Sequence, residues 1–184
     1  LRHVPRQWQR FGGINFANLA DHHFRVLWTA LVIARHEDAV DIEKMMKMAL
    51  VHDIAESRTN DVDYLSRQYV QHNEELAIAD MLEDTSLEEE FLAIIQEYEK
   101  RESLEAKIVK DADNLDVDLE IREQATNGIP IHQWTPYRQH VADNYLYTKT
   151  AKKIFAQIQK SDPHNWHVNS KRNRLNGGDW KKAE

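Results

Sequence analysis

Residues 103–130 read SLEAKIVKDADNLDVDLEIREQATNGIP, and this stretch predicts one long helix. Its apolar residues recur every three or four positions, which places them on one face of an α-helix. Ser103 is a favourable N-cap, and Gly128 followed by Pro130 is a typical helix end. We therefore expect a helix from Ser103 to about Asn127, the best-delimited element of the chain.

The rest of the chain has the same helical spacing, and strand-like alternation is hard to find in it. The 5 Gly and 4 Pro lie mainly near the ends of periodic stretches, as in all-helical proteins. The sequence thus predicts an all-α fold, a helical bundle of about six main helices. Besides the long helix, we expect helices at about 18–36, 41–57, 63–82, 87–100 and 136–160.

The composition indicates a single globular domain. Of 184 residues, 41% are hydrophobic and 30% are charged, which excludes a wholly disordered or membrane-embedded chain. No apolar run approaches the ~18 residues that a membrane helix needs. We expect one domain over residues 1–162 and a polar, basic, loosely attached tail over 163–184.

The net charge and the numbers of Cys and His limit which partners and which metal ligands are possible. There are 24 Lys plus Arg against 31 Asp plus Glu, a formal net charge of −7, which argues against a polymeric nucleic-acid partner. A small phosphate ester is compatible with this charge if a bound cation supplies the positive field. With 0 Cys and 10 His, a metal would need His, Asp or Glu ligands. No signal peptide is visible, and we expect a cytoplasmic location and no membrane partner.

Short polar segments at two expected helices carry candidate metal ligands. His52 and Asp53 interrupt an apolar helical stretch, and Glu56 follows on the same side of the expected helix. Taken alone, this pair is as consistent with a capped or solvated helix end as with a metal site. A second segment, Asp-His-His at residues 21–23, opens the first expected helix, where an acidic residue lies favourably at the N-terminus.

A third segment is the acidic run within the long helix. Asp113 lies at the border of the apolar face, where an unpaired buried carboxylate would be costly, so we interpret it as a metal ligand. For Asp111, Asp116 and Asp118, a solvated acidic stripe is the favoured interpretation.

The order His, then His-Asp, then a distant Asp resembles the HD-domain metal-dependent phosphohydrolases. Segments 19–25, 49–61 and 105–113 look like the branch of that superfamily that includes the 5′-deoxynucleotidases. The resemblance covers residues 4–125 approximately, and it implies the HD-type helical domain.

The resemblance implies one divalent cation held by four side chains: His22, His52, Asp53 and Asp113. It leaves out His23, for which a core or outer position is the expectation. Two imidazoles and two carboxylates suit Mn, Co, Fe, Ni or Zn, which the sequence does not distinguish. Dinuclear relatives have further histidines before the last Asp, whereas this chain has only His72 there, so a single cation is implied.

The resemblance also implies roles around the cation. Glu56 is similar to a carboxylate that activates or orients the attacking water, and an ion pair with Arg58 is the alternative. Asp61 matches a residue of the substrate loop. Asn60 stands where the nucleotidases usually have Gly, and residues 62–64 depart from the family pattern, which puts nucleotide selectivity in doubt.

Near the N-terminus, an Arg-Trp unit of the family orients the phosphate and packs on the sugar or base. Trp8 matches that unit, although a core-packing role is equally consistent. Gln7 stands where the Arg is expected, which leaves Arg6 or Arg10 for a bidentate phosphate contact. Surface exposure is the alternative for both arginines.

Together, these expectations indicate a metal-dependent phosphohydrolase acting on a small nucleotide, first of all a nucleoside 5′-monophosphate. One alternative is a nucleoside-triphosphate phosphohydrolase or other phosphoesterase on the same site. Another is a non-catalytic metal- or nucleotide-binding module. The resemblance alone also implies a homodimer.

Overall fold

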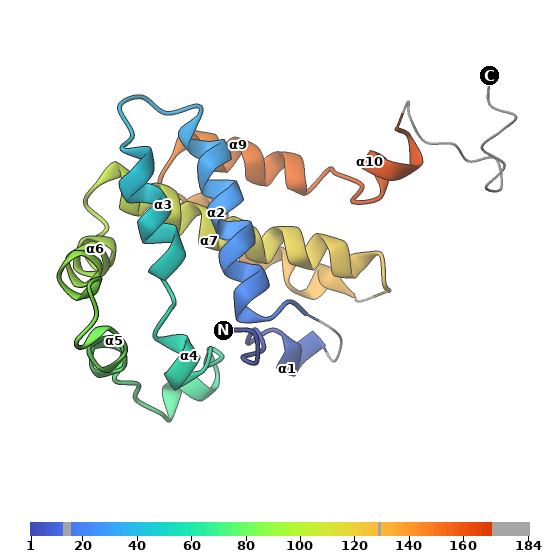
Figure 1. Ribbon diagram of the computed structural model, residues 1–184. Coiled ribbons are helices and arrows are strands. Elements are labelled where there is room, and N and C mark those ends of the chain that lie inside the picture. The colour runs from blue at the N-terminus through green and yellow to red at the C-terminus, as the bar shows by residue number, and fades with distance from the viewer. Residues whose placement is uncertain (13–15, 129, 171–184) are drawn as a thin grey trace, which may run out of the picture.

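The computed structural model describes residues 1–12, 16–128 and 130–170 (Figure 1). Within these ranges the chain is helical, with one isolated antiparallel bridge between Pro5 and Asn18. The predicted all-α fold is confirmed. The main helices are α2 (Leu19–Ala34), α3 (Ile42–Val51), α5 (Glu74–Leu82), α6 (Glu88–Lys100), α7 (Leu104–Ala125), α8 (Thr135–Asn144) and α9 (Lys149–Ile158). Shorter turns of helix are α1 (Gln9–Gly12), α4 (Glu56–Thr59), η1 (Ser66–Gln68), η2 (Ile131–Gln133) and α10 (Asn165–Val168).

Helix α7 is the centre of the fold, because α2, α3, α6 and α9 all pack against it (Figure 1). Its N-terminal end follows from local capping, because Ser103 Oγ accepts a hydrogen bond from the backbone N–H of Ala106. The core forms where fully buried side chains of α7 meet those of α2 and α3: Ile108, Val109, Ala112, Leu115, Val26, Ala30, Ile33, Met45 and Met48. This packing brings the start of α2, the end of α3 and the middle of α7 together.

The expected helix over 63–82 begins only at Glu74. Asp63 Oδ1 accepts hydrogen bonds from the backbone N–H groups of Leu65 and Ser66, which is a turn that competes with helix formation. Asn73 then caps α5. The expected helix over 41–57 is likewise interrupted by a turn between α3 and α4.

The expected helix over 136–160 is divided into α8 and α9. Asp111 accepts hydrogen bonds from the backbone N–H groups of Tyr147 and Thr148 and from the Thr148 hydroxyl. Thr148 in turn caps α9, since its Oγ1 accepts from the backbone of Ala151. A buried carboxylate of α7 therefore fixes the break between the two helices.

The interpretation of Asp111, Asp116 and Asp118 as a solvated stripe is wrong. All three are buried, with exposed fractions of 0%, 1% and 3%. Asp118 forms a bidentate pair with the Arg138 guanidinium, with N···O distances of 2.9 and 2.8 Å. Asp116 pairs with Arg25 at 2.5 Å. Each carboxylate meets donors from another segment, which offsets the cost of burying its charge.

The domain boundary near residue 162 stays a prediction. Helix α10 lies within the expected tail, and residues 171–184 of that tail lie outside the described residues. Among the described helices, none is both long enough and apolar enough to cross a membrane.

Candidate metal centre

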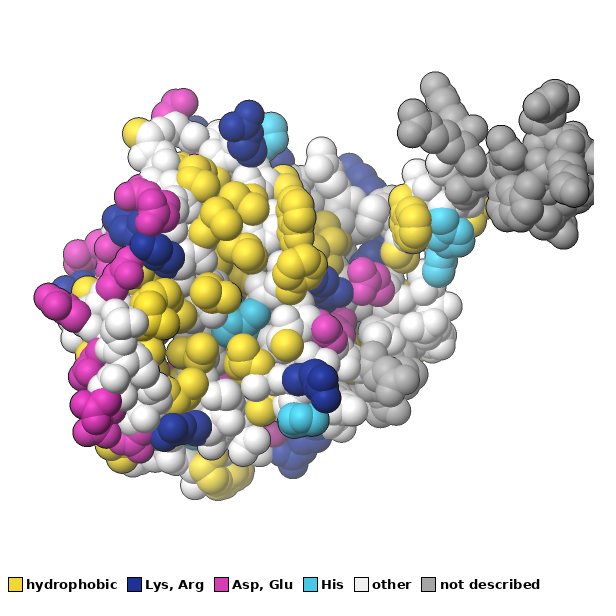
Figure 2. Space-filling view, viewed as in Figure 1, with side chains coloured by type: hydrophobic (Ala, Val, Ile, Leu, Met, Phe, Trp, Pro, Cys, Tyr) yellow, Lys and Arg dark blue, Asp and Glu magenta, His cyan; other side chains and the backbone are white. Residues whose placement is uncertain are grey.

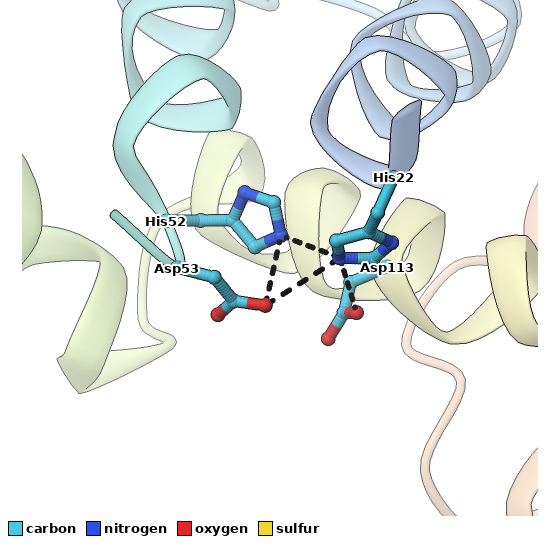
Figure 3. A group of neighbouring side chains, drawn as sticks. All are labelled: His22, His52, Asp53 and Asp113. Carbon is cyan, nitrogen blue, oxygen red and sulfur yellow. Dashed lines mark hydrogen bonds and ion pairs between the residues drawn. The ribbon is translucent and has the colours of Figure 1, made fainter. Parts of the chain in front are cut away.

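The four ligands implied by the sequence lie together at the meeting point of α2, α3 and α7 (Figure 3). His22 comes from the first turn of α2, His52 and Asp53 follow the end of α3, and Asp113 lies on α7. One candidate ligand atom from each lies within 4.8 Å of all the others. His22 Nε2 is 3.4 Å from Asp53 Oδ2 and 3.4 Å from Asp113 Oδ1.

The outer nitrogens of both imidazoles are held by acceptors. His22 Nδ1 lies 2.6 Å from Asp116 Oδ2, and His52 Nδ1 lies 2.9 Å from the carbonyl oxygen of Ala49. Each Nδ1 therefore donates, which leaves a lone pair on each Nε2 when the rings are neutral. Figure 3 shows these two Nε2 atoms facing one another, and they are 3.3 Å apart.

The chemistry of this group fits a divalent cation. Two Nε2 lone pairs and two carboxylates converge, and such a group repels itself unless it takes up positive charge. Burial and Arg6 lower the pKa of His22, yet the hydrogen bonds to Asp116 and Asp53 outweigh them and raise it to about 9. Without a cation, the site thus takes up a proton instead.

His23 lies beside this group and outside it. Its Nδ1 is 3.1 Å from the carbonyl oxygen of Leu50, and its ring centroid is 4.7 Å from that of His52. Burial and the His52 imidazole lower the pKa of His23 to about 3, so the ring is neutral. His23 thus lies buried next to the ligand His52, in agreement with the core or outer position expected for it.

Glu56 lies next to the ligands with one free oxygen. Its Oε2 is buried, has no hydrogen-bond partner in the described part of the chain and lies 3.8 Å from Arg6 Nη1. The alternative pairing with Arg58 is wrong, since Arg58 contacts Asp80 instead, at 3.5 Å. Burial, and then the nearby carboxylates, raise the pKa of Glu56 to about 9. Without a cation this carboxyl group is therefore protonated near neutral pH, and a cation bound by the neighbouring ligands would favour its ionised form, which can accept a proton.

Arg6 is buried, so the surface alternative is wrong for this arginine. Its Nη1 lies 2.8 Å from Asp61 Oδ2 and 3.8 Å from Asp53 Oδ2. Asp61 also accepts hydrogen bonds from the backbone N–H and the side-chain amide of Gln7. Asp61 thus holds both Gln7 and Arg6, and Arg6 lies next to the ligand Asp53. The residue before Asp61, Asn60, has a φ of 64° and a ψ of 156°, which lies outside the left-handed helical region and is a conformation adopted mainly by glycine, the residue that the resemblance places here.

The structure does not bring Arg10 to the cavity that opens in front of the four ligands. Arg10 is largely exposed, and its Nη1 lies 2.7 Å from Asp63 Oδ2. Trp8 lines the cavity, and it also packs in the core against Trp134, with ring centroids 5.8 Å apart. The core-packing interpretation of Trp8 is therefore confirmed, and its contact with a sugar or base stays a prediction. Arg10 lies on α1 and pairs with Asp63 in the loop before η1.

A cavity of about 340 Å³ opens in front of the ligands. Arg6, Trp8 and Glu56 line one part of it. Another part is lined by residues that the sequence analysis missed: Tyr98, Arg101 and Lys110. Lys110 had a signal, because it lies one helical turn before Asp113, and its Nζ is 2.6 Å from Asp113 Oδ2. Tyr98 and Arg101 carry no motif, and only the packing of α6 on α7 brings them here.

Comparison with known proteins agrees with this geometry. The HD domain family model matches residues 1–160. A 5′-deoxynucleotidase of Danio rerio is 34% identical over 129 residues, which cover 67% of this chain and 64% of that relative. A 5′-deoxynucleotidase of Schizosaccharomyces pombe is 29% identical over 127 residues, 64% of this chain and 63% of the relative. The match thus spans a little under two thirds of the length of these relatives.

Solved structures share the fold. A conserved hypothetical protein from Pyrococcus furiosus has a TM-score of 0.72 at 25% identity, over 88% of this chain and 94% of that chain. A protein from Pyrococcus horikoshii has a TM-score of 0.70 at 26% identity, over 87% and 93%. Since the family model spans nearly all of the described residues and the His, His-Asp and Asp side chains meet at one point, this chain belongs to the HD domain family.

Proposed function

We propose that this protein is a metal-dependent phosphohydrolase that removes phosphate from (deoxy)nucleoside 5′-monophosphates. The observation that carries this proposal is the convergence of two Nε2 atoms and two carboxylates on a cavity that also holds a buried arginine and the free oxygen of Glu56. The similarity to 5′-deoxynucleotidases supports the substrate class.

We assign one divalent cation to four residues: His22, His52, Asp53 and Asp113. Among the described residues, these form the group of His and acidic side chains close enough to share an ion, and His72 lies away from it, which supports a single cation. The donor set is compatible with Mn, Co, Fe, Ni or Zn. When bound, such a cation lowers the pKa of water and polarises a phosphoryl oxygen.

The protein side chains supply the remaining steps. Glu56 accepts a proton from the attacking water through its free Oε2. Arg6, held by Asp61, donates hydrogen bonds to the phosphoryl oxygens. A bond forms between the water oxygen and phosphorus, the P–O5′ ester bond breaks, and the leaving nucleoside oxygen takes up the proton that Glu56 accepted, which restores the carboxylate. Trp8 offers an apolar ring for the sugar or base.

Phosphate release from a nucleotide panel tests this function. The protein is loaded in turn with each of the five metals and incubated with nucleoside and 2′-deoxynucleoside mono- and triphosphates. We expect inorganic phosphate from the monophosphates. Release of inorganic triphosphate from the nucleoside triphosphates would favour the alternative, a nucleoside-triphosphate phosphohydrolase. If no nucleotide is hydrolysed with any metal but nucleotide binding is measurable, the protein would be a non-catalytic binding module.

The Arg6→Gln variant tests which arginine contacts the phosphate. We expect KM for the monophosphate to rise by ~10- to 100-fold, the value of a charge-assisted hydrogen bond. Arg10→Gln is the matched control and is expected to leave KM unchanged, because Arg10 pairs with Asp63 outside the cavity. Equal effects of the two variants on KM would contradict the assignment.

We also propose that the protein is a homodimer and that it associates through an apolar patch on α2 and α3. The α2–α3 patch consists of exposed side chains at four-residue spacing on each helix: Phe24, Trp28, Val32, Ile42, Met46 and Leu50. Figure 2 shows hydrophobic side chains gathered over these two helices. Together they expose on the order of 600 Å², most of the ~800 Å² that each partner buries in a stable interface.

The cytoplasmic location expected from the sequence stays a prediction.

The Trp28→Asp variant tests the α2–α3 patch. Trp28 lies at the centre of the patch and is 59% exposed, and a charge there would be buried without a partner in a dimer. We expect the variant to be monomeric by light scattering at concentrations where the unmodified protein is dimeric. The control is Trp166→Asp, since Trp166 is 78% exposed on α10, outside the patch. A dimer in both variants would place the interface elsewhere.

A further inference from the structure

The end of α6 and the middle of α7 contribute a group of hydrogen-bond donors to the cavity, and the mechanism above does not use it. Tyr98 lies in the last turn of α6, Arg101 follows that helix, and Lys110 lies on α7. All three line the same cavity as Asp53 and Asp113. We refer to Tyr98, Arg101 and Lys110 as the α6–α7 donor cluster.

Tyr98 presents a hydroxyl group with nothing to bind. The residue is 2% exposed, and its ring lies edge-on to the ring of the ligand His52, with centroids 5.9 Å apart. Its Oη is buried and has no hydrogen-bond partner among the described residues. Because a buried hydroxyl without a partner is costly, this position favours an acceptor in the cavity, next to the candidate ligands.

Arg101 presents a second donor without a partner. Its guanidinium carbon lies 3.4 Å from the centroid of the Tyr98 ring, so the group is stacked on that ring. Its Nη1 is buried and has no hydrogen-bond partner among the described residues, and Glu99 approaches only Nη2, at 3.9 Å. Arg101 also has a φ of 54°, a left-handed position after a helix where Gly or Asn is usual.

Lys110 adds positive charge to the same wall. Its Nζ donates to Asp113 Oδ2 at 2.6 Å, and an ammonium group has three donors. Arg101 and Lys110 line one cavity, so an anion bound there would offset the repulsion between the two cations. A group of three donors with two positive charges is complementary to an oxyanion with several acceptor oxygens.

We propose that the α6–α7 donor cluster binds the phosphoryl oxygens of the substrate and of the product, inorganic phosphate. This inference rests on the function proposed above and adds three residues that none of the comparisons assigns. Arg6 and the α6–α7 donor cluster come from different segments, so the phosphoryl group is held by donors from two parts of the chain. Tyr98 and Arg101 are binding residues in this arrangement, and Lys110 both binds phosphate and orients Asp113.

Calorimetric titration of the metal-loaded protein with inorganic phosphate tests this proposal. Tyr98→Phe removes only the hydroxyl, and we expect the Kd for phosphate to rise by ~2- to 10-fold. Arg101→Asn keeps a residue that tolerates the left-handed backbone, and we expect a rise of ~10- to 100-fold. Lys110 is left intact because it contacts Asp113. Matched controls at exposed positions are Tyr145→Phe and Arg58→Asn, for which we expect an unchanged Kd.

The metal content of each variant is measured in the same samples and is expected to equal that of the unmodified protein. Unchanged phosphate affinity in both Tyr98→Phe and Arg101→Asn, with metal bound, would overturn the proposal. The same variants are also titrated with the nucleoside, which has no phosphate group. Weaker binding of the nucleoside with unchanged binding of phosphate would assign the cluster to the sugar or base, and would also overturn the proposal. If no nucleotide is hydrolysed but phosphate binding depends on Tyr98 and Arg101 as expected, the proposed function fails and the phosphate site stands.

Discussion

Replacing Asp53 by Ala is expected to remove the bound cation and to lower phosphate release by at least ~1,000-fold. Asp53 Oδ2 lies 3.4 Å from the Nε2 atoms of both His22 and His52, so one carboxylate joins the two imidazoles. Its loss leaves three candidate ligands and removes negative charge that holds a cation. Metal content by mass spectrometry and phosphate release are measured on the same preparation.

The control is Asp80→Ala, which removes a carboxylate of equal size from an exposed pair with Arg58. Such a pair contributes little to stability, so metal content and rate should stay at the level of the unmodified protein. Full turnover and full metal content in Asp53→Ala would show that the ligand assignment is wrong. We expect His52→Ala to behave like Asp53→Ala, since both side chains belong to the same group.

Replacing Glu56 by Gln is expected to keep the cation and to lower the rate by ~100- to 10,000-fold. The amide fills nearly the same volume as the carboxyl group but cannot accept a proton from water. Metal content and phosphate release, measured together, separate this effect from loss of the site. A Gln variant with an unchanged rate would exclude Glu56 as the proton acceptor and would leave it a structural role.

The same variant has a signature in the pH dependence of stability. Burial raises the pKa of Glu56 from its ordinary 4.5 to about 9 in the folded, metal-free protein. Between these values the folded state holds a proton that the unfolded state has lost, so this group makes the free energy of unfolding fall as pH rises. We expect a smaller fall between about pH 4.5 and about pH 9 in metal-free Glu56→Gln than in the unmodified protein, by chemical denaturation. An identical pH dependence in the two proteins would contradict a raised pKa for Glu56 in the folded state.

Local signals predicted some elements well, and long-range contacts decided the others. The helix expected from Ser103 to Asn127 is observed as α7, because its caps lie in the neighbouring sequence. For the helix expected over 63–82 only the start was wrong, because the side chain of Asp63 forms a turn and also binds Arg10, which is far away in the sequence. Spacing of apolar residues contains no information about such a partner.

The same distinction applies to the candidate site. The order of His22, His52, Asp53 and Asp113 points to a shared cation, and the structure brings the four together. The choice between Arg6 and Arg10 depends on which carboxylate each one meets, and the sequence left it open. Tyr98 and Arg101 belong to the cavity only because α6 packs on α7. Side chains that act through tertiary packing rather than through a motif are therefore the part of the site that the sequence missed.

Titration of the metal-free protein with a divalent cation, with phosphate release from a deoxynucleoside 5′-monophosphate followed in the same samples, tests the central claim most directly. We predict that activity is absent without metal, rises in proportion to bound cation and reaches its maximum at one cation per chain. Phosphate release by the metal-free protein, or a maximum that requires two cations per chain, would contradict a single catalytic cation held by His22, His52, Asp53 and Asp113.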